Sequence, residues 1–328
     1  MNSTLITTLV LLILICISFA AIAQQKHISQ YPNQFTRDGH LIVLPDHGTI
    51  YIVSDLHAHW DDFNQWLQQT QLIERIKAGE DVYGLMLGDA IDYKPGEIPQ
   101  PPYGDIQIIN RVIEIQQQLG ENGKRLIYLR GNHEYAAADL YEMLKKRGMT
   151  EHNRKEFIDA LYNSPLGLTY QQFNFIERMS DVHYDFLMNI PTIVVAKNGF
   201  TAVHAGPARS KITLSELIKP DIKLLDEILW DRPDVAYSGG YTQKHTVDFL
   251  KMLNAKFLVV GHTPISYFPK ENIRDGVARL GGIQLIFSTG YGGLNRDGQT
   301  YIEIDLAKTY TSVDEFELGV NIHRLYPE

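Results

Sequence analysis

Five short polar clusters, each following an apolar run, carry the side chains that this sequence could use for chemistry. They are Ser54–His57, Gly88–Asp92, Gly131–Glu134, His204–Gly206 and Gly261–Thr263. In an open α/β sheet the carboxyl ends of strands face a common crevice, so side chains far apart in the sequence can meet there. A lone histidine after a strand is usually a hydrogen-bonded surface or core residue. All five clusters together predict a functional site.

The donor atoms in these clusters are those that hold borderline divalent metals: carboxylate oxygens, imidazole nitrogens and an amide oxygen, without a thiolate. Two cations close together need an anion between them, and Asp89 is expected to be that bridging carboxylate. Asp55 and His57 flank Leu56 on a segment that reads as extended, so we expect both on one face as ligands of a first ion. The donors left for a second ion are Asn132, His204 and His262.

Phosphoryl transfer is the chemistry that such a metal pair serves best. Two cations can bind phosphate oxygens while lowering the pKa of a shared water. His133 is expected to protonate the leaving group, with Asp92 fixing its tautomer and raising its basicity. Glu134 reads only as a favourable anion in the first turn of a helix.

Strands must position these polar clusters, and the apolar runs of the sequence predict where those strands lie. Leu41–Leu44 and Thr49–Ser54 flank the turn Pro45–Gly48 and are predicted to form a hairpin. Further strands are predicted at Val82–Leu87, Arg125–Leu129, Thr192–Ala196, Thr201–His204, Phe257–Val260, Ile283–Ser288 and Tyr301–Asp305. Helical periodicity predicts helices at about Asp61–Ala78, Ile106–Leu119, Glu134–Lys146, Asn174–Met188 and Thr242–Leu253. Strands alternating with helices predict a layered α/β protein.

The composition is that of a globular protein and argues against binding to a nucleic acid duplex. Of 328 residues, 44% are hydrophobic and 21% charged, and the formal net charge is −9. Duplexes bind to clustered Lys and Arg, and this sequence has no long basic run. A chain of this length buries enough surface to fold without disulfides. The single cysteine, Cys16, lies in the N-terminal apolar run.

Residues 1–23 are predicted to be a signal peptide. Leu5–Ala23 carries no charge and ends in small residues that suit cleavage. We therefore expect an exported protein, periplasmic or secreted, without a stable membrane span after cleavage. Because the first residues offer only the α-amino group as a positive charge, the alternative is an uncleaved anchor that tethers the protein to the membrane. A polar segment, residues 24–38, then precedes a single catalytic domain, residues 39–328.

Six motifs in order resemble those of calcineurin-like metallophosphoesterases. They are Asp55-x-His57, Gly88-Asp89-x-x-Asp92, Leu129-Arg130-Gly131-Asn132-His133-Glu134, His204-Ala205-Gly206, Leu229-Trp230 and Gly261-His262-Thr263. The glutamate after Asn132-His133 makes the chain similar to the phosphoprotein phosphatase family, and the resemblance spans roughly residues 49–293.

The resemblance implies a fold, a metal centre and an activity. The fold would be α/β, a metallophosphatase-like β-sandwich of two mixed sheets flanked by helices on both sides. The activity would be phosphomonoester hydrolysis at a dinuclear centre, with His133 and Asp92 as the acid pair. The implied ligands are Asp55, His57 and Asp89 for the first metal, and Asp89, Asn132, His204 and His262 for the second.

The sequence departs from the family where phosphate is bound. Eukaryotic members follow the position of Asp92 with Arg-Gly, and that arginine grips phosphate, whereas this chain has Tyr93-Lys94 and a proline-rich loop. Arg232, two residues after a tryptophan, instead resembles the Trp-x-Arg of the bacterial-type, Shewanella-like branch. Arg232 is therefore the first candidate for binding the substrate phosphate, and the others are Arg130 and Lys94.

We predict an exported, metal-dependent phosphomonoester hydrolase of the serine/threonine or tyrosine protein phosphatase type. It would use two divalent ions, manganese, iron or zinc, since nitrogen and oxygen ligands accept each of them. Its partner would be a phosphoprotein or a small phosphate ester. A phosphodiesterase or nucleotide hydrolase on the same centre is one alternative, with a base pocket built by Tyr93–Asp105. Another is a noncatalytic binding protein with this fold, against which the complete ligand set argues. The oligomeric state is left open.

Overall fold

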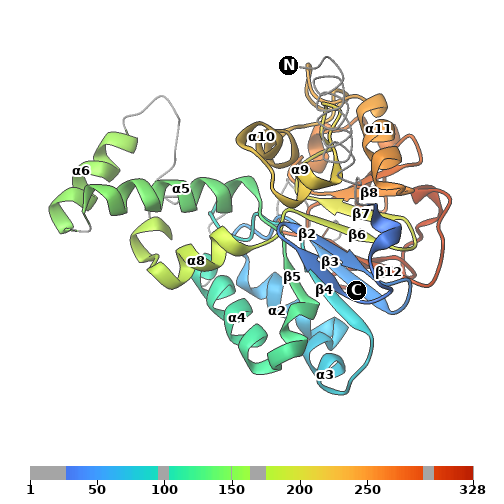
Figure 1. Cartoon of the computed structure of the whole chain (residues 1–328), viewed down its shortest axis with the longest axis horizontal. Coiled ribbons are helices and arrows are strands. Elements are labelled where there is room, and N and C mark those ends of the chain that lie inside the picture. The colour runs from blue at the N-terminus through green and yellow to red at the C-terminus, as the bar shows by residue number, and fades with distance from the viewer. Residues whose placement is uncertain (1–26, 95–102, 149, 163–174, 291–298, 328) are drawn as a thin grey trace, which may run out of the picture.

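Two β-sheets stack face to face in the computed structural model of this chain (Figure 1), which describes residues 27–94, 103–148, 150–162, 175–290 and 299–327. The larger sheet has eight strands in the order β1 (Thr36–Asp38), β2 (Leu41–Leu44), β6 (Ile193–Ala196), β7 (Phe200–Val203), β8 (Phe257–Val260), β11 (Gln284–Ile286), β10 (Val277–Leu280) and β9 (Ile273–Arg274). The smaller has five, in the order β13 (Ile322–Arg324), β12 (Thr300–Asp305), β3 (Thr49–Val53), β4 (Val82–Met86) and β5 (Leu126–Tyr128). Both contain parallel and antiparallel neighbours.

Alternate side chains of each strand fill the space between the sheets and the space outside them. In β2, Ile42 and Leu44 belong to the apolar cluster between the sheets, whereas Leu41 and Val43 belong to the cluster on the outer face. Successive side chains of a strand point to opposite faces, so this strand is buried on both sides. Burial on both faces explains why such strands read as continuous apolar runs in the sequence.

Helices cover both outer faces of the sandwich (Figure 1). Over the smaller sheet pack α2 (Trp60–Thr70), α3 (Leu72–Lys77), α4 (Gly104–Leu119), α5 (Asn132–Arg147) and α8 (Asp181–Asn189). Over the larger sheet pack α9 (Leu214–Ile218), α10 (Ile222–Trp230) and α11 (Gln243–Leu253). Helix α5 projects from the body, and α6 (Glu151–Tyr162) lies at its far end. Short 3₁₀ turns lie at Ile28–Gln30, Gly120–Arg125, Ile265–Tyr267, Lys270–Asn272 and Val313–Glu315. The expected sandwich of two mixed sheets flanked by helices is confirmed.

The predicted hairpin of Leu41–Leu44 and Thr49–Ser54 is wrong. β2 pairs with β1 and β6 in the larger sheet, whereas β3 pairs with β4 and β12 in the smaller one. The turn Pro45–Gly48 therefore carries the chain from one sheet to the other. Gly48 has φ +92°, and a Cβ there would lie 2.3 Å from the carbonyl oxygen of Asp81, so this crossing requires glycine.

Two of the predicted helices are each divided in two. Gln71 adopts a left-handed conformation, φ 49°, which separates α2 from α3 inside the predicted helix Asp61–Ala78. In the predicted helix Asn174–Met188, the helical stretch 175–178 is separated from α8 by the extended N-cap residue Ser180. Both halves of each divided helix bury apolar side chains in the same cluster. The apolar periodicity of the sequence therefore continues across the point where the helix is interrupted.

Strand β1, Thr36–Asp38, lies before the predicted domain boundary at residue 39. Strand β1 pairs antiparallel with β2, and Ile28 and Tyr31 are buried against the outer face of the larger sheet. Part of the predicted polar segment 24–38 therefore belongs to the domain. The predicted signal peptide, residues 1–23, and most of the proline-rich loop lie outside the described residues. Within the described part of the chain, no helix is long and apolar enough to cross a membrane.

Candidate active site

The polar clusters meet at one end of the sandwich because the strands that precede them run parallel. In the smaller sheet, the parallel neighbours β3, β4 and β5 lead into Asp55–His57, Asp89–Asp92 and Asn132–Glu134. In the larger sheet, the parallel neighbours β7 and β8 lead into His204 and His262. The carboxyl ends of parallel strands share one edge of a sheet. In this protein that edge of the smaller sheet lies beside the corresponding edge of the larger sheet.

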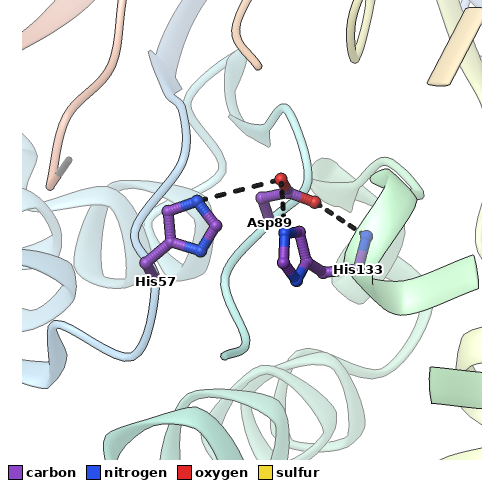
Figure 2. A group of neighbouring side chains, drawn as sticks. All are labelled: His57, Asp89 and His133. Carbon is purple, nitrogen blue, oxygen red and sulfur yellow. Dashed lines mark hydrogen bonds and ion pairs between the residues drawn. The ribbon is translucent and has the colours of Figure 1, made fainter. Parts of the chain in front are cut away.

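Asp89 is shared by two groups of side chains that could each hold a metal ion. His57 and His133 complete one group, and His204 and His262 complete the other, with one donor atom per residue within 4.8 Å of the others in its group. The Asp89 Oδ2 atom lies 3.8 Å from His57 Nε2 and 3.4 Å from His204 Nε2. Figure 2 shows the Asp89 carboxylate between His57 and His133. Asp89 thus lies where a carboxylate bridging two cations would lie.

Three of these imidazoles are held in a tautomer suited to metal binding. The ring nitrogen remote from Asp89 contacts a backbone carbonyl in each case: His57 Nδ1 those of Ile91 and Asp92 at 3.1 Å, His204 Nδ1 that of Leu87 at 2.9 Å, and His262 Nε2 that of Trp230 at 3.1 Å. A carbonyl only accepts, so these nitrogens carry a hydrogen and the opposite ones are the nitrogens left to bind a metal. Metal-ligating histidines are oriented in this way, so the donor set fits a borderline divalent cation.

Asp55 and Asn132 each place an oxygen beside one of the two groups. Asp55 Oδ1 lies 4.0 Å from His57 Nε2, and the Asp55 carboxylate accepts the backbone N–H of His262 at 3.0 and 2.9 Å. Asn132 Oδ1 lies 3.0 Å from His204 Nε2. The structure therefore brings together the residues predicted as metal ligands. His133, which the sequence assigns to proton transfer, also lies within reach of Asp89.

Left-handed backbone shapes the site. The φ angles are 42° at Asp55, 40° at His57, 52° at Asp89, 67° at Asp92 and 63° at His262. This conformation is unfavourable for residues with a side chain, and such residues gather at functional sites. The expectation that Asp55 and His57 share a face of an extended segment is therefore wrong, because the two side chains converge through a left-handed bend after β3.

Glu134 organises the backbone of the site, a role that the sequence analysis missed. Its fully buried carboxylate accepts the backbone N–H groups of Asp89 at 2.9 Å, Ala90 at 3.0 Å and Gly131 at 2.9 Å, and the Tyr128 hydroxyl at 2.6 Å. A glutamate at the third position of a helix often bonds back to the N-cap, so Gly131 followed by Glu134 was the available signal. The contacts to the Asp89 loop have no signal in the sequence.

His133 and Asp92 form a close pair at the edge of the site. The Nδ1–H of His133 donates to Asp92 Oδ2 at 2.5 Å, which leaves Nε2 directed toward the centre, 3.9 Å from Asp89 Oδ2. Burial lowers the pKa of His133, but the carboxylates of Asp89 and Asp92 outweigh it, so the pKa is raised. Lys94 Nζ lies 3.0 Å from His133 Nε2.

The charges of the site favour a bound cation. Burial by itself raises the pKa of Asp89, but the imidazoles of His204 and His133 outweigh it and hold this pKa well below its usual value. Burial lowers the pKa of His204, but the Asp89 carboxylate outweighs it and raises this pKa to about 9. The carboxylates thus keep a proton on His204 in the metal-free protein. A divalent cation would displace that proton, as metal binding to histidine does in general.

The candidate phosphate-binding residues lie in different surroundings. Arg130 Nη2 donates to the carbonyls of Leu187 and Met188 at 2.9 and 2.6 Å, which holds this end of its guanidinium at α8, although its buried Nε, like that of Arg232, has no hydrogen-bond partner among the described residues. Arg232 follows Trp230, whose carbonyl contacts His262, and its buried Nε has no hydrogen-bond partner among the described residues. Arg232 and Lys94 therefore remain candidates, whereas Arg130 is better explained by the fold.

A family model for the calcineurin-like phosphoesterases matches residues 48–266, most of the chain. A solved protein serine/threonine phosphatase from Saccharomyces cerevisiae is similar in fold, with a TM-score of 0.50, 15% identity, and coverage of 79% of this chain and 73% of that one. A cold-active protein-tyrosine phosphatase from a Shewanella species has a TM-score of 0.47 and 17% identity, covering 84% and 79%. No curated protein matches. The family match, together with the order and geometry of the site residues, shows that the chain belongs to the calcineurin-like phosphoesterase family.

Proposed function

We propose that this protein is a metal-dependent phosphomonoester hydrolase of the protein phosphatase type. The observation that carries the proposal is the His133–Asp92 pair, held at 2.5 Å beside an aspartate shared by two potential ligand groups. A metal-binding protein without phosphoryl-transfer activity has no need for an oriented imidazole at the edge of its site. A phosphatase needs one to protonate the departing oxygen.

The metal ligands that we propose come from both sheets. Asp55, His57 and Asp89 would hold one ion, and the residues holding the other would be Asp89, Asn132, His204 and His262. When bound, the ions supply polarisation of the phosphoryl oxygens and a water acidified for in-line attack on phosphorus. The protein fixes the orientation of each imidazole through its backbone carbonyl partner.

His133 is the proposed general acid. Its Nδ1–H bond to Asp92 fixes the ring, and the raised pKa of the imidazole favours the protonated form that a general acid needs. An ester oxygen leaving from a phosphate between the two ligand groups would accept the Nε2 proton. Asp92 stabilises the imidazolium before transfer, because a buried carboxylate favours the charged form.

Arg232 and Lys94 are the proposed contacts for the substrate phosphate. A phosphomonoester carries about two negative charges near neutral pH. The planar guanidinium of Arg232 can donate two parallel hydrogen bonds to it, and the Lys94 ammonium beside His133 adds a point charge. Losing the Arg232 contact should reduce kcat/KM by about 10-fold or more, since charge-assisted hydrogen bonds contribute about 1.5–3 kcal/mol each.

The test combines metal analysis of the purified protein with hydrolysis of a panel: phosphoserine and phosphotyrosine peptides, nucleotides, p-nitrophenyl phosphate and bis-p-nitrophenyl phosphate. We expect bound divalent metal and faster hydrolysis of monoesters than of the diester. Preferential hydrolysis of the diester or of nucleotides would assign a phosphodiesterase or nucleotide hydrolase instead. Metal binding without hydrolysis of any member would leave only a binding protein.

We also propose that the protein is exported through its N-terminal apolar segment. The support is the uncharged Leu5–Ala23 run and the small residues at its end. Fractionation of expressing cells and N-terminal sequencing test this. Cleavage near Ala23 supports export with release, an intact N-terminus in the membrane fraction supports a tether, and recovery of the full chain in the cytoplasm contradicts both.

A further inference from the structure

The loop that follows His204 reaches across to the segment that carries Arg232. Arg209 lies in this loop, and its Nε and Nη2 atoms donate to the two carboxylate oxygens of Asp231. Asp231 Oδ1 in turn accepts the backbone N–H of Arg232 at 3.1 Å. A planar guanidinium paired through two bonds fixes the orientation of a carboxylate as well as its position. The Asp231 side chain is therefore held between one arginine side chain and the backbone of another.

The loop around Arg209 is itself fixed to α10. The backbone N–H of Arg209 donates to Glu227 Oε2 at 2.8 Å, and the Ser210 hydroxyl contacts the same carboxylate at 3.2 Å. Nearer the site, the backbone N–H of Ala205 donates to the carbonyl of Ile228 at 2.9 Å. Arg209 thus approaches Asp231 from an anchored loop, which lowers the entropic cost of holding the ion pair.

The backbone of Arg232 is also held on its carbonyl side. The N–H of Tyr241 donates to the Arg232 carbonyl at 2.8 Å, and a Cβ at Gly240 would lie 1.9 Å from that oxygen, so the contact excludes any larger residue. Tyr241 is fully buried. With Asp231 on its N–H and Tyr241 on its C=O, the Arg232 backbone has little freedom. Its direction therefore depends on both neighbours.

The side chain of Arg232 is the part that this clamp leaves unbound. Its buried Nε has no hydrogen-bond partner within the described part of the chain. The carbonyl of Trp230, two residues before Arg232, contacts His262 Nε2 at 3.1 Å, so the segment that carries Arg232 lies against this imidazole. A buried polar nitrogen without a partner carries a desolvation cost that a bound anion would remove.

We propose that Arg209 is a positioning residue, which holds the guanidinium of Arg232 toward the substrate phosphate through the carboxylate of Asp231. This inference rests on the proposed phosphate-binding role of Arg232. Arg209 pairs with Asp231 through the edge formed by its Nε and Nη2 atoms, and in this proposal it does not touch the substrate. Arg209 pre-organises Arg232. Without Arg209, the Asp231 carboxylate can rotate and the turn that follows α10 can relax.

The test measures the binding of inorganic phosphate to the metal-loaded protein, by calorimetry and by competitive inhibition, in four variants. Arg209→Gln should weaken phosphate binding by about 3- to 10-fold, and Arg232→Ala by about 10-fold or more. Arg209→Gln in the Arg232→Ala background should cause no further loss, because the residue acts only through Arg232. Arg209→Lys should restore part of the binding, since it keeps the charge without the fork.

The matched control is Arg111→Gln, which breaks another surface pair, Arg111 with Glu114 at 2.7 Å on α4. It should leave phosphate binding unchanged, and metal content should equal that of the parent in every variant. The positioning role would be overturned if Arg209→Gln weakened phosphate binding equally in the parent and in the Arg232→Ala background. It would also be overturned if Arg209→Gln left phosphate binding unchanged while Arg232→Ala bound phosphate poorly. If Arg232→Ala itself binds phosphate normally, the phosphate-binding role fails first, and the two failures are thereby distinguished.

Discussion

At the scale of single residues, the site separates groups that would hold metal from groups that would move a proton. His133 is the one histidine of the cluster whose remote nitrogen contacts a carboxylate, Asp92, while those of His57, His204 and His262 contact backbone carbonyls. A carbonyl fixes a neutral tautomer, whereas a carboxylate also stabilises the protonated ring. The nature of the partner therefore distinguishes the proposed acid from the proposed ligands.

His133→Asn should slow esters with poorly acidic leaving groups by about 10²- to 10⁴-fold and p-nitrophenyl phosphate much less, because an activated aryl oxide leaves without a proton. The measurement is kcat/KM for both substrate types at equal metal content. Asp92→Asn should show the same pattern more weakly. Equal losses on both substrates, or a loss of bound metal that accounts for the effect, would remove His133 from the acid role.

Glu134→Gln should weaken metal binding without touching a ligand. The amide keeps the shape of the side chain but replaces one acceptor by a donor, so a backbone N–H near Asp89 loses its partner. We expect a metal affinity lower by about 10- to 100-fold and a free energy of unfolding lower by roughly 1–3 kcal/mol. Metal titration and urea unfolding measure the two effects. Glu142→Gln, on the same helix but at the surface, is the control, and an unchanged metal affinity in Glu134→Gln would contradict the prediction.

At the scale of elements, the start of α4 is tied to the loop that carries Asp92, one member of the proposed acid pair. The Tyr93 hydroxyl accepts the backbone N–H of Gly104 at 3.0 Å. Asp105, fully buried, accepts Arg178 Nη2 at 3.0 and 3.1 Å, and the Arg178 guanidinium lies 4.3 Å from the ring centre of Tyr103. These contacts join α4 to the helical stretch before α8. They fix both ends of the proline-rich loop next to the site.

This buried pair makes stability depend on pH. Burial raises the pKa of Asp105 from 3.8 to about 6, although Arg178 opposes this shift. Between these values the folded protein binds a proton that the unfolded chain releases, so the free energy of unfolding falls as pH rises through this window, by at most about 3 kcal/mol. Asp105→Asn should flatten this part of the curve. Urea unfolding of both proteins at several pH values between 4 and 7 measures the difference, and parallel curves would contradict it.

At the scale of the whole molecule, the core and the site are separate. Three apolar clusters, one between the sheets and one on each outer face, account for the packing, and the site lies at the edge where the strands end. The buried polar ligands add no apolar area to these clusters. The fold therefore has its main source of stability apart from the metal centre.

Chelation of the purified protein should abolish hydrolysis while leaving the far-UV circular dichroism nearly unchanged. The melting temperature should fall by several degrees, because a ligand present at 100 to 1,000 times its Kd stabilises the folded state by about 2.7–4 kcal/mol. Adding back manganese, iron or zinc should restore hydrolysis and show which of these metals supports it. Activity that persists after verified metal loss would exclude the proposed mechanism, and unfolding on chelation would show that the metals are part of the core stability.

The sequence by itself determined the family and the main elements, and it predicted which residues meet at the site. Apolar runs ending in Asp, Asn or His are local signals, and most predicted strands match observed ones within one or two residues. Short strands at sheet edges, such as β9 and β13, carry too few apolar residues to be predicted, and the amphipathic helix α10 was overlooked. Local periodicity also placed β2 and β3 in one hairpin, since it contains no information on which strand pairs with which.

Only the tertiary structure decided which side chains meet and which roles remain. The left-handed bends at Asp55 and His57, the three N–H groups gathered by Glu134, and the occupation of Arg130 by α8 all depend on contacts between distant segments. Residue type shows that an arginine can bind phosphate, but whether it is available depends on the carbonyls and carboxylates around it. Burial and neighbouring charge determine protonation for the same reason, because both belong to the folded molecule and neither is a property of the local sequence.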